Sequence, residues 1–191
     1  MNWIWRRAAR IVAAPDQEWR SVQAEPARPL AVMLYILLLS LIPAAGWSTG
    51  LWLFGNETSV GRGAQISGVG QIAYRGLLAA AGFVLWVVLC AATLVALARL
   101  FGAARDWARA LQVAAYSATP VALAGLLLIQ PNLLSVLIIA FFYSLYLQYM
   151  GVQQLLNVKE RDAAEFVALN TMALMLLSTV LGAFGGWLGL L

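Results

Sequence analysis

The chain has 191 residues, of which 63% are apolar and only 10% are charged, with a net charge of +4. Soluble domains are about half apolar and about a quarter charged, so this composition excludes a soluble globular protein and a disordered chain. The sequence has no histidine and a single cysteine, which excludes imidazole metal sites, Ser-His and Cys-His nucleophile pairs and an intrachain disulfide. Cys90 lies in an apolar run and is expected to be a packing residue rather than a catalytic one.

The apolar residues are concentrated in five runs of about 20 residues, the length at which a helix crosses a bilayer. We therefore predict an all-α membrane protein with five transmembrane helices and a short N-terminal amphipathic interfacial helix. The predicted organisation is a cytoplasmic amphipathic N-terminal segment, 1–28, followed by a five-span membrane domain, 29–191. The spans are expected at 30–54, 76–98, 111–129, 133–152 and 166–190.

Residues 2–13 predict a short amphipathic helix. At about 100° per residue, its apolar side chains fall on one side and its arginines on the other. The apolar side consists of Ile4, Trp5, Ala8, Ile11 and Val12. We expect the helix to lie in the headgroup layer, where Trp3, Arg6, Arg7 and Arg10 contact the membrane surface. The alternative is the start of a signal peptide, which is disfavoured because no adequate apolar core precedes Pro15.

Prolines and acidic residues mark the next elements. Pro15, followed by Asp16 and Glu18, is typical of a helix start. In the first span, Pro43 is expected to break the helix because it has no N–H to donate. The Gly- and Ser-rich stretch 55–75 is expected to be the longest loop between spans, and it contains a glycosylation triplet, Asn56-Glu57-Thr58, which also occurs often by chance.

The third span contains the polar stretch that we single out as the main candidate site. Pro120 cannot donate to the carbonyl of Tyr116, and its ring crowds that carbonyl, so a kink is expected there. Hydroxyl groups lie beside the freed carbonyl on Tyr116, Ser117 and Thr119. The kink can serve helix packing, or it can form a contact for a partner or ligand.

The fourth span carries tyrosines near its predicted cytoplasmic end, after a tight turn at Gln130-Pro131-Asn132. Tyr143 and Tyr146 are three residues apart and share roughly one helix face. They suit an interfacial aromatic belt, and the alternative is a groove that they line together with Tyr116.

The fifth span ends in two GxxxG patterns, which allow close approach of helix backbones. This approach can occur within the chain or between two copies. The glycines are Gly182 and Gly186 in one pattern, and Gly185 and Gly189 in the other.

The basic residues predict the orientation. Ten of the twelve lie on one predicted side, in the N-terminal segment and in the second and fourth connections, and two lie on the other. The positive-inside rule then gives a cytoplasmic N-terminus and an external C-terminus. No acidic or basic residue lies at the predicted mid-depth of a span, which disfavours an ion-coupled transporter.

Several stretches together resemble the Yip family, named for Rab-GTPase-interacting proteins of the eukaryotic Golgi, and in particular its bacterial inner-membrane branch. The likeness is strongest in the stretch Ala115-Tyr116-Ser117-Ala118-Thr119-Pro120, with Gly125 and Pro131 after it. It continues in Tyr146-Leu147-Gln148-Tyr149-Met150-Gly151-Val152 and Leu155-Leu156-Asn157-Val158, and it includes Pro15, Glu18, Glu25 and Ile42-Pro43. The resemblance implies five spans, a cytoplasmic N-terminus and a multi-pass protein of the bacterial inner membrane.

The resemblance also implies a non-enzymatic adaptor or membrane-organising protein that binds other membrane proteins or lipids. The alternative is a passive transporter or lipid-translocating protein with a polar groove between spans three and four. No catalytic residue, metal site, cofactor or nucleic-acid partner is expected, whereas membrane lipids, other membrane proteins and a second copy of the chain are possible partners. Two acids at the cytoplasmic edge, Asp106 and Glu165, are expected to pair with nearby arginines rather than to perform chemistry.

Overall fold

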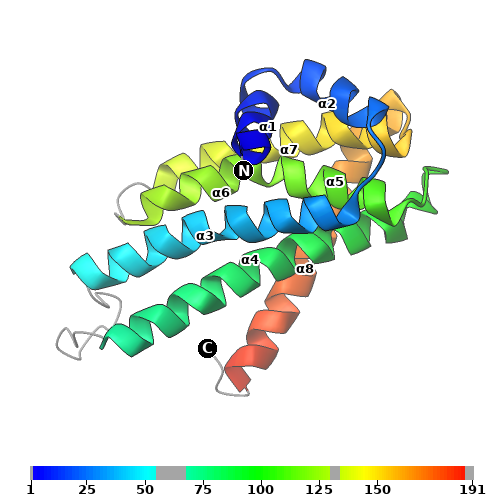
Figure 1. Cartoon of the computed structure of the whole chain (residues 1–191). Helices are drawn as coiled ribbons and strands as arrows, with labels where there is room; N and C mark the ends of the chain where they lie inside the picture. The colour runs from blue at the N-terminus through cyan, green and yellow to red at the C-terminus, as the bar shows by residue number, and fades with distance from the viewer. Residues whose placement is uncertain (1, 55–67, 130–133, 188–191) are drawn as a thin grey trace.

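A computed structural model describes residues 2–54, 68–129 and 134–187, and no strand occurs among them. The glycosylation triplet at 56–58, the turn at 130–132 and Gly189 lie outside the described residues. The helices, in chain order (Figure 1), are α1 (Asn2–Ala13), α2 (Pro15–Ala24), α3 (Pro29–Phe54), α4 (Val69–Ala98), α5 (Trp107–Ser117), α6 (Thr119–Ala124), the 3₁₀ helix η1 (Gly125–Ile129), α7 (Leu134–Leu156) and α8 (Glu160–Trp187).

The five predicted spans and the short N-terminal helix are confirmed. Five helical stretches are long and apolar enough to cross a membrane: Pro29–Leu53, Val69–Ala98, Trp107–Ile129, Ser135–Leu156 and Glu160–Ala183. Three helices start at least four residues before the predicted spans: α4 at Val69, α5 at Trp107 and α8 at Glu160. Helix α4, the second span, includes the end of the stretch that was expected to be a loop. Its first turn is closed by hydrogen bonds from the N–H groups of Gln71 and Ile72 to the carbonyl of Gly68. Helix α8, the fifth span, starts at Glu160, where acidic side chains in the first turn interact favourably with the helix dipole.

The first span differs from the sequence expectation at Pro43. Helix α3 runs from Pro29 to Phe54 without an interruption at this proline. The proline ring packs against Gly125, where a Cβ atom would lie 2.6 Å from the Cβ of Pro43. A Cβ atom added at Gly46 would likewise clash with the carbonyl oxygen of Gly125. Helix α3 is therefore continuous across the residue that lacks an N–H donor, and it packs closely against η1 at this point.

The third span lies at the centre of the bundle and is interrupted near Pro120. Every residue from 110 to 120 is buried. Helix α5 ends at Ser117, Ala118 forms a turn, and α6 begins at Thr119 with Pro120 in its first turn. Proline suits this place because its missing N–H would have no helical acceptor there.

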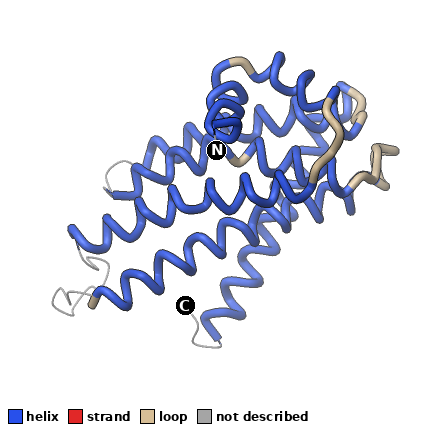
Figure 2. The backbone as a smooth tube through the Cα atoms, viewed as in Figure 1, coloured by secondary structure: helices blue, strands red, loops and turns tan. Residues whose placement is uncertain are grey.

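The N-terminal helices form a pair that packs on one end of the bundle. In Figure 1, α1 and α2 lie over the region where α5, α6 and α7 run. Trp19 of α2 is fully buried, and its ring lies against Gly151 of α7, where a Cβ atom would approach it to 2.8 Å. In Figure 2, the described loops lie mostly at one end of the bundle, where α2 is joined to α3 and α4 to α5.

Candidate functional site

Tyr116, the central residue of the predicted site, is buried and faces the N-terminal pair and α3. Its ring meets the ring of Tyr35 edge-on with 5.2 Å between centroids, and the ring of Trp19 lies 6.2 Å away. Tyr35 and Trp19 come from α3 and α2. Tyr116, near the C-terminal end of α5, is therefore part of the surface on which the N-terminal pair packs.

Arg7 binds two carboxylates and Tyr116 at this surface. Its Nε lies 3.2 Å from Oε1 of Glu18, and its Nη2 donates to Oε1 of Glu25 at 2.6 Å. A longer contact of 3.4 Å joins Nη1 to the hydroxyl of Tyr116, and the guanidinium carbon lies 5.5 Å from the centre of the Tyr116 ring. Burial alone would lower the pKa of Arg7, but the Glu25 hydrogen bond and the Tyr116 contact outweigh it and raise the pKa above its ordinary value.

Arg109 fixes the other end of the N-terminal pair. Its guanidinium donates to the backbone carbonyls of Val22 at 2.9 Å, of Gln23 at 3.3 Å and of Glu25 at 3.0 Å. These carbonyls belong to the C-terminal end of α2, where a cation is favoured by the helix dipole. Asp106, expected from the sequence to pair with an arginine, instead caps α5 by accepting hydrogen bonds from the N–H groups of Ala108 and Arg109.

The predicted membrane-surface residues point in different directions. Arg6 and Arg10 are exposed, and Trp3 is 41% exposed and also lies 6.5 Å from the ring of Tyr35. Arg7 is turned inward, onto the carboxylates described above. The apolar side of α1 is covered by protein: Ile4, Ala8 and Ile11 are buried, whereas Trp5 is exposed. Ile4, Ala8 and Ile11 thus pack against the bundle and do not form an apolar face that is open to lipid.

The remaining hydroxyl groups of the predicted site have separate partners. Thr119 is fully buried, and its Oγ1 lies 2.7 Å from the hydroxyl of Tyr35. Tyr143 donates to the carbonyl of Val12 in α1 at 2.7 Å, and its ring lies 6.0 Å from the half-exposed Tyr146. Tyr116 and Thr119 therefore contact α3 and the N-terminal pair, whereas Tyr143 contacts the end of α1.

Ser117 faces away from this group, into a cavity of about 430 Å³. The cavity is bordered by α4, α5, α7 and α8 and also takes in Ser144 and Gln148 of α7 and Cys90 of α4. None of Tyr116, Thr119, Tyr143 and Tyr146 lines it. The predicted polar stretch thus contributes to two features. Tyr116 and Thr119 contact Tyr35 on one side of the third span, and Ser117 lines the cavity on the other.

A buried polar cluster beside the cavity was missed by the sequence reasoning. Asn170 of α8 accepts a hydrogen bond from Thr93 of α4 at 2.6 Å, and its amide nitrogen lies 3.5 Å from Sγ of Cys90. Gln148 donates to the same sulfur at 3.2 Å. An amide in the apolar run of the fifth span was the available signal, since a polar side chain at membrane depth needs a partner on another helix. No group of three or more Cys, Asp and Glu residues suited to a metal ion occurs in the described ranges.

The glycine patterns at the end of α8 stay a prediction. A Cβ atom at Gly182 would meet nothing within 4 Å, so no neighbouring helix of the described chain packs on it. Gly185 and Gly186 belong to α8, and Gly189 lies outside the described residues.

Comparisons with known proteins gave one match. A family model described as the Yip1 domain matches residues 9–182. No curated protein matches the chain, and no solved structure does. The matched range begins inside α1 and includes four membrane-spanning stretches completely and all but the last residue of the fifth.

Proposed function

The chain belongs to the Yip1 domain family, and we propose that this multi-pass membrane protein is a non-enzymatic adaptor or membrane-organising protein. Its working surface is the outer face of the N-terminal helix pair. Its partners are membrane lipids or other membrane proteins, and it needs no cofactor.

The observation that carries the proposal is that the N-terminal pair is built onto the bundle and keeps a basic, aromatic outer face. Arg7 and Arg109 hold the two helices from the inside. On the outside, the exposed side chains include Trp3, Trp5, Arg6, Arg10 and Arg20, together with the acidic Asp16 and the polar Gln17. A fixed surface of arginines and tryptophans suits anionic headgroups or an acidic protein partner at the membrane surface.

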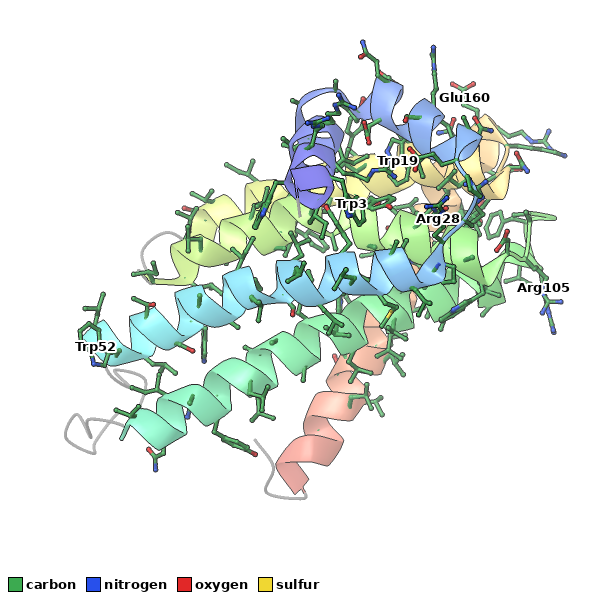
Figure 3. All side chains as sticks on the ribbon, viewed as in Figure 1. Trp3, Trp19, Arg28, Trp52, Arg105 and Glu160 are labelled. Atoms are coloured by element: carbon green, nitrogen blue, oxygen red, sulfur yellow. The ribbon has the colours of Figure 1, made fainter. Side chains whose placement is uncertain are left out.

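The charge distribution supports a cytoplasmic position for this surface. In Figure 3, the labelled side chains of Arg28, Arg105 and Glu160 lie at the same end of the bundle, and Trp52 lies at the opposite end. Ten of the twelve basic residues belong to the segments at the charged end. We therefore place the N-terminus in the cytoplasm and the C-terminus outside, and the likeness to the bacterial branch favours the bacterial inner membrane.

The test is photocrosslinking from the full chain in its native membrane. A photoreactive amino acid replaces Arg10 on the outer face, and a matched control replaces Leu176, which is 68% exposed on α8. We expect a discrete protein adduct or an anionic-lipid headgroup adduct from position 10 that position 176 does not give. The same unspecific adducts from both positions would contradict the proposal.

A second candidate is passive transport or lipid translocation, favoured by the cavity beside the third span. The groove expected from Tyr116 and Thr119 is not the path in this arrangement, because both residues are buried against Tyr35. A path would run instead past Ser117 and Ser144. Lipid scrambling or solute flux in reconstituted vesicles supports this candidate, and the absence of both removes it.

A further inference from the structure

The cavity beside the third span has the form of a binding site distinct from the N-terminal surface. Its volume of about 430 Å³ falls in the range of small-molecule sites, which is about 300–1,000 Å³. Most of its lining is apolar and includes Trp86, Phe141 and Leu174. Such a lining with a few polar groups is typical of a ligand pocket.

The cavity is deep on one side and reaches lipid on the other. Ser117 and Ser144 are 4% and 5% exposed. On α8, by contrast, the lining residues Met175, Ser178 and Thr179 are exposed. In Figure 1, the C-terminal half of α8, which carries these exposed residues, runs away from α7. A ligand can therefore enter sideways from the bilayer.

Two buried hydroxyl groups in the cavity lack a partner. The Oγ atoms of Ser117 and Ser144 have no hydrogen-bond partner among the described residues. Two threonines in the same lining differ: Thr171 and Thr179 each donate to the carbonyl four residues earlier at 2.8 Å. A helical serine has the same option, and a buried polar group without a partner is unfavourable in an apolar region. The hydroxyl groups of Ser117 and Ser144 are thus free to donate and accept hydrogen bonds within the same cavity.

The lining also restricts the charge and size of the ligand. No Asp, Glu, Lys or Arg is among the lining residues of the described chain, so nothing there would compensate a phosphate or a carboxylate. The volume lies in the lower part of the range for small-molecule sites, which favours one hydrocarbon chain over two. We propose that the cavity binds a neutral single-chain lipid whose hydroxyl head hydrogen-bonds to Ser117 and Ser144 and whose chain lies against Trp86, Phe141 and Leu174.

The test uses a long-chain alcohol that carries a photoreactive diazirine, bound to the full-length protein in nanodiscs of neutral phospholipid. Adducts are mapped by mass spectrometry, and labelling is normalised to folded protein. The variant Ser117→Ala/Ser144→Ala removes both head contacts. Its matched control, Thr171→Val, removes a hydroxyl in the same cavity that is already bonded within its own helix.

We expect saturable labelling of the cavity residues, competed by an unlabelled alcohol but not by an alkane of equal length. Labelling should fall about tenfold in the double serine variant, as expected for the loss of two hydrogen bonds, and should stay unchanged in the threonine control. Equal competition by the alkane, equal labelling of the double variant, or adducts spread over the lipid-facing surface would overturn the proposal. The last outcome would mean that water alone satisfies the two serines. Because the N-terminal surface is untouched, none of these results bears on the proposed adaptor role.

Discussion

At the scale of single residues, Arg7 shows what a helical pattern can and cannot predict. The spacing of α1 correctly predicts that Ile4, Ala8 and Ile11 share a buried side, although Trp5, expected on the same side, is exposed. It gives no reason to distinguish Arg7 from Arg6 and Arg10, because the distinction depends on Glu18 and Glu25 in α2. These carboxylates come close only when the two helices fold back on each other. The residue that looked like a lipid contact is thus the one that holds the pair together.

Replacing Arg7 tests this assignment. We expect Arg7→Met to lower the stability of the detergent-solubilised protein by about 3 kcal/mol, because the side chain of Glu18, only 6% exposed, loses its partner. This corresponds to a fall of about 6–12 °C in the thermal midpoint for a chain of this size. Protease sensitivity near Ala14, between α1 and α2, should rise with it.

The matched control is Arg6→Met, which changes a neighbouring exposed arginine. It should alter stability by no more than about 0.5 kcal/mol. Similar midpoints for the two variants would show that Arg7 does not hold the pair.

At the scale of elements, the spans could be predicted because hydropathy and length decide them. The starts of α4, α5 and α8 could not, because these helices begin in polar segments that lie outside the apolar runs. The two intramembrane prolines had different outcomes. Pro120 lies at an interruption, whereas Pro43 lies within a continuous helix that packs tightly against η1. The rule that proline interrupts a helix does not distinguish these two cases from the local sequence.

The contact between α3 and η1 can be tested at Gly125. A Cβ atom at this position would lie 2.6 Å from Cβ of Pro43 and 2.9 Å from its Cα, so Gly125→Ala should overpack the contact and cost about 1–3 kcal/mol. Gly182→Ala is the control, since nothing lies within 4 Å of its added methyl group. The control should be neutral or gain about 0.5–1 kcal/mol. Equal thermal midpoints for the two variants would contradict the close packing.

The interruption at Pro120 can be tested by a double-mutant cycle with Tyr35. Pro120→Ala allows α5 and α6 to join, which should turn Thr119 away from Tyr35 and cost about 1 kcal/mol through the lost hydrogen bond. In a Tyr35→Phe background this hydrogen bond is already absent, so the same substitution should cost less. Strictly additive effects on thermal stability would mean that the interruption does not position Thr119.

At the scale of the whole molecule, the fold consists of a five-span bundle that carries its N-terminal helices as an integral part. Trp19 seated on Gly151, Arg7 over Tyr116 and Arg109 at the end of α2 make three connections between the pair and the bundle. The sequence contains each residue, but their pairing spans about a hundred positions and requires the tertiary arrangement. The divergence of α8 from α7 likewise belongs to the tertiary arrangement and is not given by any local pattern.

Hydrogen exchange of the full-length protein in nanodiscs tests this integration most directly. We expect the amides of α1 and α2 to exchange slowly, as a unit with α5 and α7. Gly151→Leu, which displaces the ring of Trp19, should remove the protection of both N-terminal helices together while that of α3 and α4 persists. Rapid exchange of α1 and α2 in the unmodified protein, at the rate of a free peptide, would contradict the account, because the proposed working surface would then have no fixed form.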